Sequence, residues 1–223
     1  MVEFSELSLC LDLDGTVVDT APDLIRVLNE VIAKEGLSET SYPLARQAIG
    51  YGSRRLIEDA FSRAEHSVSS SRVDALQKLF LKLYAQDSAQ LSRPFEGVVE
   101  TLIYLKRAGV NLSVCTNKPG YLARPLLDKL GLTPLFSKIV GGDDLPRNKP
   151  HADHIFAAAG HRNANRIVMV GDGAPDSLAA KAANVPCILM AYGYSTVPFE
   201  HLGADVVLRR FRDIPSALQN MHV

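Results

Sequence analysis

The sequence contains little cysteine, no tryptophan and no long hydrophobic run. Its three cysteines, Cys10, Cys115 and Cys187, include no close pair and have no histidine beside them. A disulfide framework is therefore not expected. Cys10 and Cys115 lie inside apolar stretches, where we expect buried, reduced thiols.

The chain also lacks a surplus of charge of either sign. It has 24 basic and 25 acidic residues among 223. This balance lacks the excess of positive charge that binding to nucleic acid or to an anionic membrane requires. No stretch approaches the roughly 18 apolar residues of a membrane span. No basic segment precedes an apolar one at the N-terminus, as a signal peptide requires. We therefore expect a cytoplasmic protein without nucleic-acid or membrane partners, either a monomer or a homodimer.

The order of apolar and helical stretches predicts an α/β fold. Short apolar runs alternate with helical patterns, which is typical of a parallel sheet covered by helices on both faces. The runs are Leu7–Leu13, Val110–Thr116, Arg166–Gly171, Val185–Met190 and, more weakly, Ser137–Val140. We expect a Rossmann-like parallel core formed by residues 1–20 and 93–223.

Residues 21–92 break this alternation. Helical patterns cover Pro22–Lys34, Ser53–Glu65 and Val73–Ala89, and no apolar run of comparable strength lies between them. We therefore expect an inserted α-helical cap domain at 21–92.

Polar clusters follow the predicted strands. They are Asp12 and Asp14 after the first strand, Thr116 and Asn117 after the second, Lys149 just before a helix, and Asp172 and Asp176 after the fourth. Ligands of open α/β sheets bind beyond the carboxyl ends of the strands, so these side chains should share one pocket. Crowded carboxylates repel one another unless a hard cation lies between them, and oxygen ligands favour Mg²⁺. The pattern predicts a magnesium site.

The same set of side chains suits the transfer of phosphate. Thr116 and the helix that begins after Asn117 can bind phosphate oxygens, and Lys149 can neutralise their charge. One carboxylate can attack phosphorus, and a second carboxylate two residues further on can move protons. Each motif alone could be a turn, a helix cap or a surface lysine. Their shared placement at strand ends and helix starts favours a functional site.

Taken in this order, the clusters resemble the signature of the haloacid dehalogenase superfamily of aspartate-nucleophile phosphatases. The resemblance implies the following roles: Asp12 as nucleophile and metal ligand, Asp14 as general acid and base with its main-chain carbonyl on the metal, Thr116 and Lys149 on the phosphoryl group, and Asp172 and Asp176 as the acidic motif of the metal site. Dehalogenases lack a residue like Asp14, which favours phosphate transfer here. The insertion matches the helical cap of one subgroup, which closes over the site.

Within this superfamily the chain is similar to phosphoglycolate phosphatases. The similarity lies in Leu13–Leu24, Ile49–Gly52, Thr116–Pro119 and Gly141–Asp144. It implies 2-phosphoglycolate as the small phosphorylated substrate. Gly50 and Gly52 are interpreted either as backbone that approaches this substrate or as a plain turn between helices. Arg54, or Arg55 beside it, is interpreted as a partner of the substrate carboxylate, and a solvated helix face is the alternative for at least one of them.

Several alternatives stay open at this point. A sugar-phosphate mutase, a pyrophosphatase, or a phosphatase for another small metabolite such as an amino-sugar phosphate would use the same motifs. A non-catalytic phosphate-binding protein is a further alternative, although pure binding does not need both Asp12 and Asp14. His151, His154 and His161 are expected at the surface or as caps rather than in a transition-metal cluster.

Overall fold

The computed structural model describes residue 4 and residues 6–221, apart from the side chains of residues 46 and 47. The chain divides into two compact units. The first, an α/β unit, takes residues 1–18 and 94–223. The second, a helical unit, takes residues 19–93.

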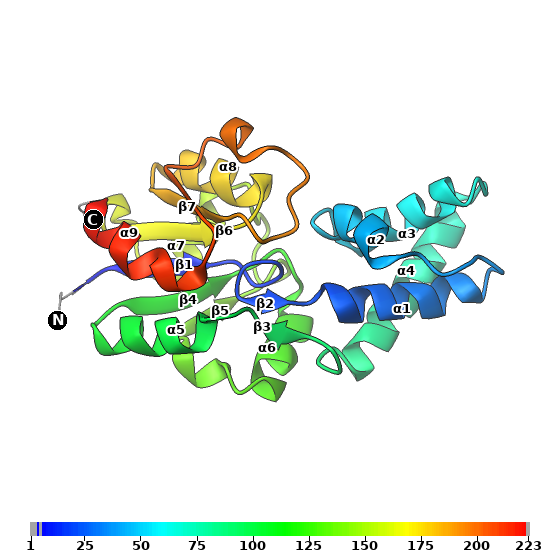
Figure 1. Cartoon of the computed structure of the whole chain (residues 1–223), viewed down its shortest axis with the longest axis horizontal. Helices are drawn as coiled ribbons and strands as arrows, with labels where there is room; N and C mark the ends of the chain where they lie inside the picture. The colour runs from blue at the N-terminus through cyan, green and yellow to red at the C-terminus, as the bar shows by residue number, and fades with distance from the viewer. Residues whose placement is uncertain (1–3, 5, 222–223) are drawn as a thin grey trace. The chain divides into compact units, whose positions relative to one another are not determined.

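The α/β unit is built on a six-stranded sheet in the order β5-β4-β1-β6-β7-β8, and every neighbouring pair is parallel (Figure 1). The strands are β1 (Ser8–Leu11), β4 (Asn111–Cys115), β5 (Lys138–Val140), β6 (Ile167–Gly171), β7 (Cys187–Met190) and β8 (Val206–Leu208). Strand β1 lies inside the sheet, where Leu11 is opposite Val114 of β4 and Val170 of β6. All four residues of β1 are buried, as expected for a strand covered on both faces. The predicted parallel α/β fold is confirmed.

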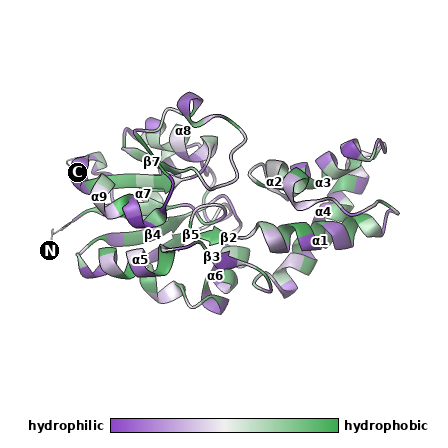
Figure 2. Ribbon diagram, in the orientation of Figure 1, coloured by the Kyte–Doolittle hydropathy of each residue, from purple (hydrophilic) through white to green (hydrophobic). Residues whose placement is uncertain are grey.

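Helices cover both faces of this sheet. They are α5 (Val98–Arg107), α6 (Gly120–Lys129), α7 (Ala152–Ala159), α8 (Ala174–Ala183) and α9 (Ile214–Asn220), with short 3₁₀ turns at Thr133–Leu135, Ala164–Arg166, Phe199–His201 and Phe211–Asp213. Helices α7 and α8 pack against each other and the sheet, while α5 packs with α9. Cys10, Cys115 and Cys187 are buried in the core beside α7 and α8 as free thiols, which agrees with the expectation for Cys10 and Cys115. Figure 2 shows hydrophobic residues concentrated on the central strands.

The helical unit contains α1 (Ala21–Ala33), α2 (Tyr42–Ile49), α3 (Gly52–Arg63) and α4 (Ser70–Gln86). Helix α1 packs against α2 and α4, and α3 packs against both of its sequence neighbours. In α4, Phe80 and Tyr84 are buried, with their ring centroids 6.2 Å apart. Helix α2 is absent from the sequence-based expectation. Within the described part of the chain, no helix combines the length and the apolar character needed to cross a membrane.

The chain passes between the units along a two-stranded sheet. Its strands are β2 (Val18–Asp19) and β3 (Arg93–Pro94). Two residues are too few for an alternating pattern, so the sequence-based expectation contains neither strand.

A buried carboxylate in the first turn of α1 binds the segment at residues 91–92, just before β3. Asp23 is fully buried, and its Oδ2 accepts hydrogen bonds from the main-chain N–H groups of Leu91 at 2.9 Å and Ser92 at 2.7 Å. The Ser92 hydroxyl donates a third at 2.7 Å, and Arg26 donates to Oδ1 at 3.1 Å. Burial alone would raise the pKa of Asp23, but the hydrogen bonds from Ser92 and Leu91 outweigh it and lower the pKa below its ordinary value.

We predict that Asp23→Asn lowers the free energy of unfolding by about 1–3 kcal/mol, because the main-chain donors of Leu91 and Ser92 and the Ser92 hydroxyl lose a charged acceptor. Urea denaturation measures the change. The folded-state pKa is lowered, so the contribution of Asp23 is complete above the unfolded pKa of about 3.9 and is lost as the pH falls through the folded pKa. The difference between variant and wild type should therefore shrink below about pH 4. Glu30→Gln, an exposed partner of Arg26 on the same helix, is the control; equal effects of the two substitutions would contradict the prediction.

Candidate active site

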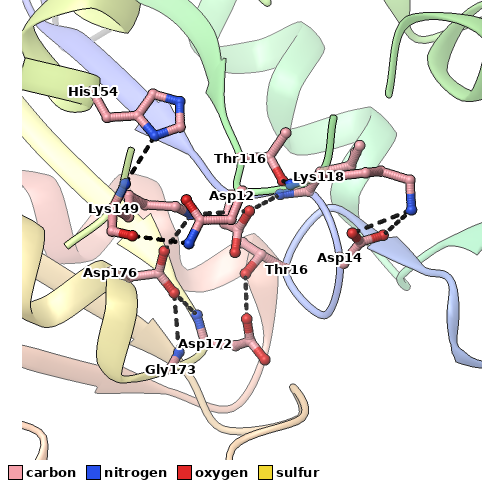
Figure 3. A network of polar contacts seen from close by, with 12 residues as sticks. Asp12, Asp14, Thr16, Thr116, Lys118, Lys149, His154, Asp172, Gly173 and Asp176 are labelled. Carbon is pink, nitrogen blue, oxygen red and sulfur yellow. Dashed lines mark hydrogen bonds and ion pairs between the residues drawn. The ribbon is translucent and has the colours of Figure 1, made fainter. Parts of the chain in front are cut away.

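The predicted site residues of the α/β unit meet at the carboxyl end of the sheet. Asp12 directly follows β1, Thr116 follows β4, and Asp172 follows β6. Because these strands are parallel neighbours in the order β4-β1-β6, their ends lie side by side. Lys149 reaches the same place from the loop between β5 and α7, and Figure 3 shows its side chain beside Asp12 and Asp176.

Three carboxylates form the centre of the site. Asp12, Asp172 and Asp176 each offer an oxygen within 4.8 Å of the others. Main-chain N–H groups hold them in place. The Oδ2 atom of Asp176 accepts from Asp172 and Gly173, both at 3.1 Å, and Oδ2 of Asp172 accepts from Tyr194 at 2.6 Å. The cluster is therefore fixed by the turn at the start of α8 and by the loop after β7.

Lys149 places a single positive charge among these carboxylates. Its Nζ lies 2.6 Å from Oδ1 of Asp176 and 3.0 Å from Oδ1 of Asp12, and only 1% of its side chain is exposed. Burial alone would lower the pKa of the ammonium, but the charges of Asp12 and Asp176 outweigh it and raise the pKa above its ordinary value. Lys149 is therefore charged at neutral pH.

The single charge of the Lys149 ammonium does not neutralise three carboxylates that are shielded from water. Burial raises the pKa of the Asp12 carboxyl to about 6, against the opposing effect of the Lys149 charge. Burial, followed by the charges of Asp176 and Asp12, raises the pKa of Asp172 well above its ordinary range. A hard cation between the three would relieve this repulsion, and carboxylate oxygens are the ligands such a cation prefers. The donor set thus fits a metal ion.

Thr116 and Asn117 are the polar pair that follows β4, and Thr116 lies beside Asp12 (Figure 3). Thr116 is buried, and its Oγ1 accepts a hydrogen bond from the main-chain N–H of Lys118 at 3.2 Å. The amide of Asn117 donates from Nδ2 to the main-chain oxygen of Lys149 at 3.0 Å. Asn117 thus supports the lysine loop, a contact that the sequence did not indicate. Its predicted role in binding substrate stays a prediction.

Asp14 lies near the cluster, but its carboxylate is not among the three grouped oxygens. Lys118 holds it, with Nζ 3.1 Å from Oδ1 and 3.3 Å from Oδ2 (Figure 3). The sequence analysis missed Lys118, although it directly follows Thr116 and Asn117. The proposed metal contact of Asp14 through its main-chain carbonyl stays a prediction.

Small residues leave room for Asp172. Thr16 donates from Oγ1 to Oδ1 of Asp172 at 3.3 Å. A Cβ added at Gly193 would lie 2.1 Å from Cβ of Asp172, and one added at Gly15 would lie 2.5 Å from its Oδ2. The backbone of Gly15 also has a φ of 84°, a value that residues other than glycine rarely adopt. Gly193 and Tyr194 come from the loop after β7, where no motif marks them in the sequence.

The predicted substrate contacts Gly50, Gly52 and Arg54 belong to the helical unit. Gly50 ends α2, and Gly52 begins α3 with a φ of 87°, which explains glycine at that position. Arg54 pairs with Asp74, and its Nε lies 3.0 Å from Oε1 of Glu58. The fold accounts for Gly52 and Arg54 without a ligand, and their contact with substrate stays a prediction.

One of the three histidines is not at the surface. His154 in α7 is fully buried, so the expectation of a surface or capping role is wrong for it. Its Nδ1 accepts a hydrogen bond from the main-chain N–H of Lys149 at 3.1 Å. Nothing in its spacing from the motif reveals this contact, because it depends on the path of the loop before α7.

Comparisons with known proteins identify the class. A family model described as haloacid dehalogenase-like hydrolase matches residues 9–190, so the chain belongs to this family and is a hydrolase. Proteins named phosphoglycolate phosphatase from Caulobacter vibrioides and Agrobacterium fabrum are each 42% identical to this chain; the matches cover 94% and 93% of it and 90% of each relative. A crystal structure of a predicted phosphoglycolate phosphatase from Haemophilus somnus has a TM-score of 0.87 at 30% identity, covering 98% of this chain and 100% of that one.

We predict that Mg²⁺ raises the Tm of the wild-type protein and that Asp172→Asn removes most of this rise. An ion bound only by the folded form adds about 2.7 kcal/mol of stability at a free concentration 100 times its Kd. Calorimetry with Mg²⁺ and with chelator measures the effect without any substrate. Asp153→Asn, which changes a carboxylate held by Arg147 and Arg162, should leave the rise intact. A rise of wild-type size in Asp172→Asn would contradict the metal assignment.

Proposed function

We propose that this hydrolase is a magnesium-dependent phosphatase that cleaves 2-phosphoglycolate through a phosphoryl group carried by Asp12. The observation that supports it most directly is the contact of Lys149 with Asp12 at 3.0 Å, inside a cluster of three carboxylates at the sheet edge. The cluster thus offers a carboxylate that can act as the nucleophile, an ammonium that can neutralise the phosphate charge, and two further acids that can bind a metal ion. This is the set that transfer of phosphate to a carboxylate requires.

In the first step, an oxygen of the Asp12 carboxylate attacks phosphorus. The bond from phosphorus to the ester oxygen breaks, and Asp14 gives its proton to that leaving oxygen. Lys149 and the hydroxyl of Thr116 bind the oxygens of the phosphoryl group during the transfer. When bound, Mg²⁺ supplies positive charge that offsets the repulsion between the phosphate and the carboxylates.

In the second step, water replaces Asp12 on phosphorus. Asp14, now a carboxylate, takes a proton from the water while the water oxygen attacks. The bond between Asp12 and phosphorus breaks, inorganic phosphate leaves, and both carboxyl groups return to their starting states. A mutase of the same family would return the phosphoryl group to a sugar, so free phosphate is the product that separates the two functions.

The substrate proposal is supported by the named relatives. Two of them match 42% of residues over nearly their whole length, and both are named phosphoglycolate phosphatase. Phosphoglycolate is a small phosphomonoester with a second anionic group, its carboxylate. A guanidinium such as that of Arg54 suits this group, provided that it exchanges Asp74 for the substrate.

We predict that Asp12→Asn lowers kcat by at least about a thousandfold, because an amide cannot act as the nucleophile. The fold should survive, as circular dichroism would show. Phosphate release with Mg²⁺ measures the rate, and Asp128→Asn, at an exposed position, is the control. If Asp12→Asn retained more than a few per cent of the wild-type rate, the covalent mechanism would be wrong.

The substrate is tested by a panel of phosphoglycolate, pyrophosphate, hexose phosphates, an amino-sugar phosphate and nucleotides. We expect kcat/KM for phosphoglycolate to exceed that for every other member by at least about a hundredfold, a difference of about 2.7 kcal/mol in transition-state binding. Chelator should stop the reaction, and added Mg²⁺ should restore it. Even, weak activity across the panel would contradict the substrate, and an isomerised sugar phosphate without free phosphate would contradict the reaction.

A further inference from the structure

Both polar groups of the Lys149 main chain are held by side chains. The N–H donates to Nδ1 of His154 at 3.1 Å, and the carbonyl oxygen accepts from Nδ2 of Asn117 at 3.0 Å. Lys149 lies outside any helix or strand, between β5 and α7. Its main chain is therefore positioned by these two side chains rather than by regular secondary structure.

The hydrogen bonds define the protonation of His154. A main-chain N–H can only donate, so Nδ1 has to be the unprotonated nitrogen of the ring. The ring proton is then on Nε2, which lies 3.2 Å from the main-chain oxygen of Val140 at the end of β5. Burial, together with the nearby charge of Lys149, lowers the pKa of His154 to about 4, in agreement with a neutral ring. His154 thus links the lysine loop to the edge strand of the sheet.

The position of the Lys149 main chain determines where its charge lies. The side chain is long and flexible, yet its Nζ contacts two different carboxylates. It lies 2.6 Å from Oδ1 of Asp176 and 3.0 Å from Oδ1 of Asp12. Misplacement of a catalytic group by about 1 Å can cost a hundredfold in rate. A residue that fixes the main chain can therefore affect the reaction without touching the substrate.

We propose that His154 is a positioning residue: Nδ1 of its neutral imidazole accepts from the Lys149 main chain and so keeps the ammonium against Asp12 and the phosphoryl group. This inference rests on the proposed function, in which Lys149 binds the phosphoryl group. The competing explanation is that His154 only fills space in the core beside β5.

Two substitutions separate these explanations, because each keeps one half of the bridge. In His154→Asn, the side-chain oxygen can take the place of Nδ1 and accept from Lys149, while the contact with Val140 is lost. In His154→Gln, the longer amide can donate to Val140, while the acceptor for Lys149 is lost. Gln fills more of the space left by the ring than Asn does, so a role in packing alone predicts that His154→Gln is at least as active as His154→Asn.

We predict that His154→Asn keeps kcat/KM for phosphoglycolate within about threefold of wild type. His154→Gln and His154→Leu should lose at least about tenfold, since the Lys149 N–H has no acceptor. Both amide variants should lower Tm, because both leave space in the core. His161→Asn is the matched control: its Nε2 contacts Oγ of Ser8 at the start of β1, the opposite end from the site, at 2.9 Å. That variant should keep wild-type activity.

NMR of ¹⁵N-labelled histidine reads the bridge itself, without activity. The wild-type protein should show His154 as the neutral tautomer with its proton on Nε2. A proton on Nδ1, or equal activities of His154→Asn and His154→Gln, would overturn the inference. The proposed function fails by a different result, namely a wild-type protein that releases no phosphate or a Lys149→Met variant that is fully active.

Discussion

The structure of the site depends on one buried positive charge. Lys149 is almost completely enclosed, and it contacts carboxylates that come from β1 and from the start of α8. Without the ammonium, Asp12 and Asp176 would be like charges in a place with little water, a costly arrangement. With it, the cluster still carries an excess of negative charge. That remaining excess explains why the site is suited to a metal ion and not to an anion alone.

The parallel sheet explains why site residues that are far apart in the sequence lie together. Each of the strands β4, β1 and β6 ends next to its neighbour, so the residue after each strand is delivered to the same edge. This is why Asp12, Thr116 and Asp172 could be placed together from the sequence. The fold class could be predicted for the same reason, since apolar strands alternate with helices. Short elements escaped prediction: β8 has three residues and is only partly buried, and α2 has eight residues beginning beside Pro43.

The contacts that hold the site could not be predicted in the same way. The contacts of His154 with Lys149 and of Tyr194 with Asp172 depend on the paths of loops. Loop paths leave no periodic pattern in a sequence. Lys118 is next to a recognised motif, yet only the structure shows that it pairs with Asp14. Sequence motifs identify groups that react, because chemistry restricts the residue type. They identify supporting groups poorly, because several residue types can donate or accept one hydrogen bond.

Hydrogen bonds to the main chain recur throughout this site and suggest how it tolerates changes of charge. Asp176 and Asp172 accept from main-chain N–H groups, and His154 accepts from that of Lys149. Such bonds keep side chains in place whether or not a metal or phosphate is bound, because their donors do not depend on the ligand. Gly193 and Gly15 preserve the space that Asp172 needs. The carboxylates of the cluster are therefore held by contacts that the chain itself supplies, which is the kind of fixed arrangement that electrostatic stabilisation requires.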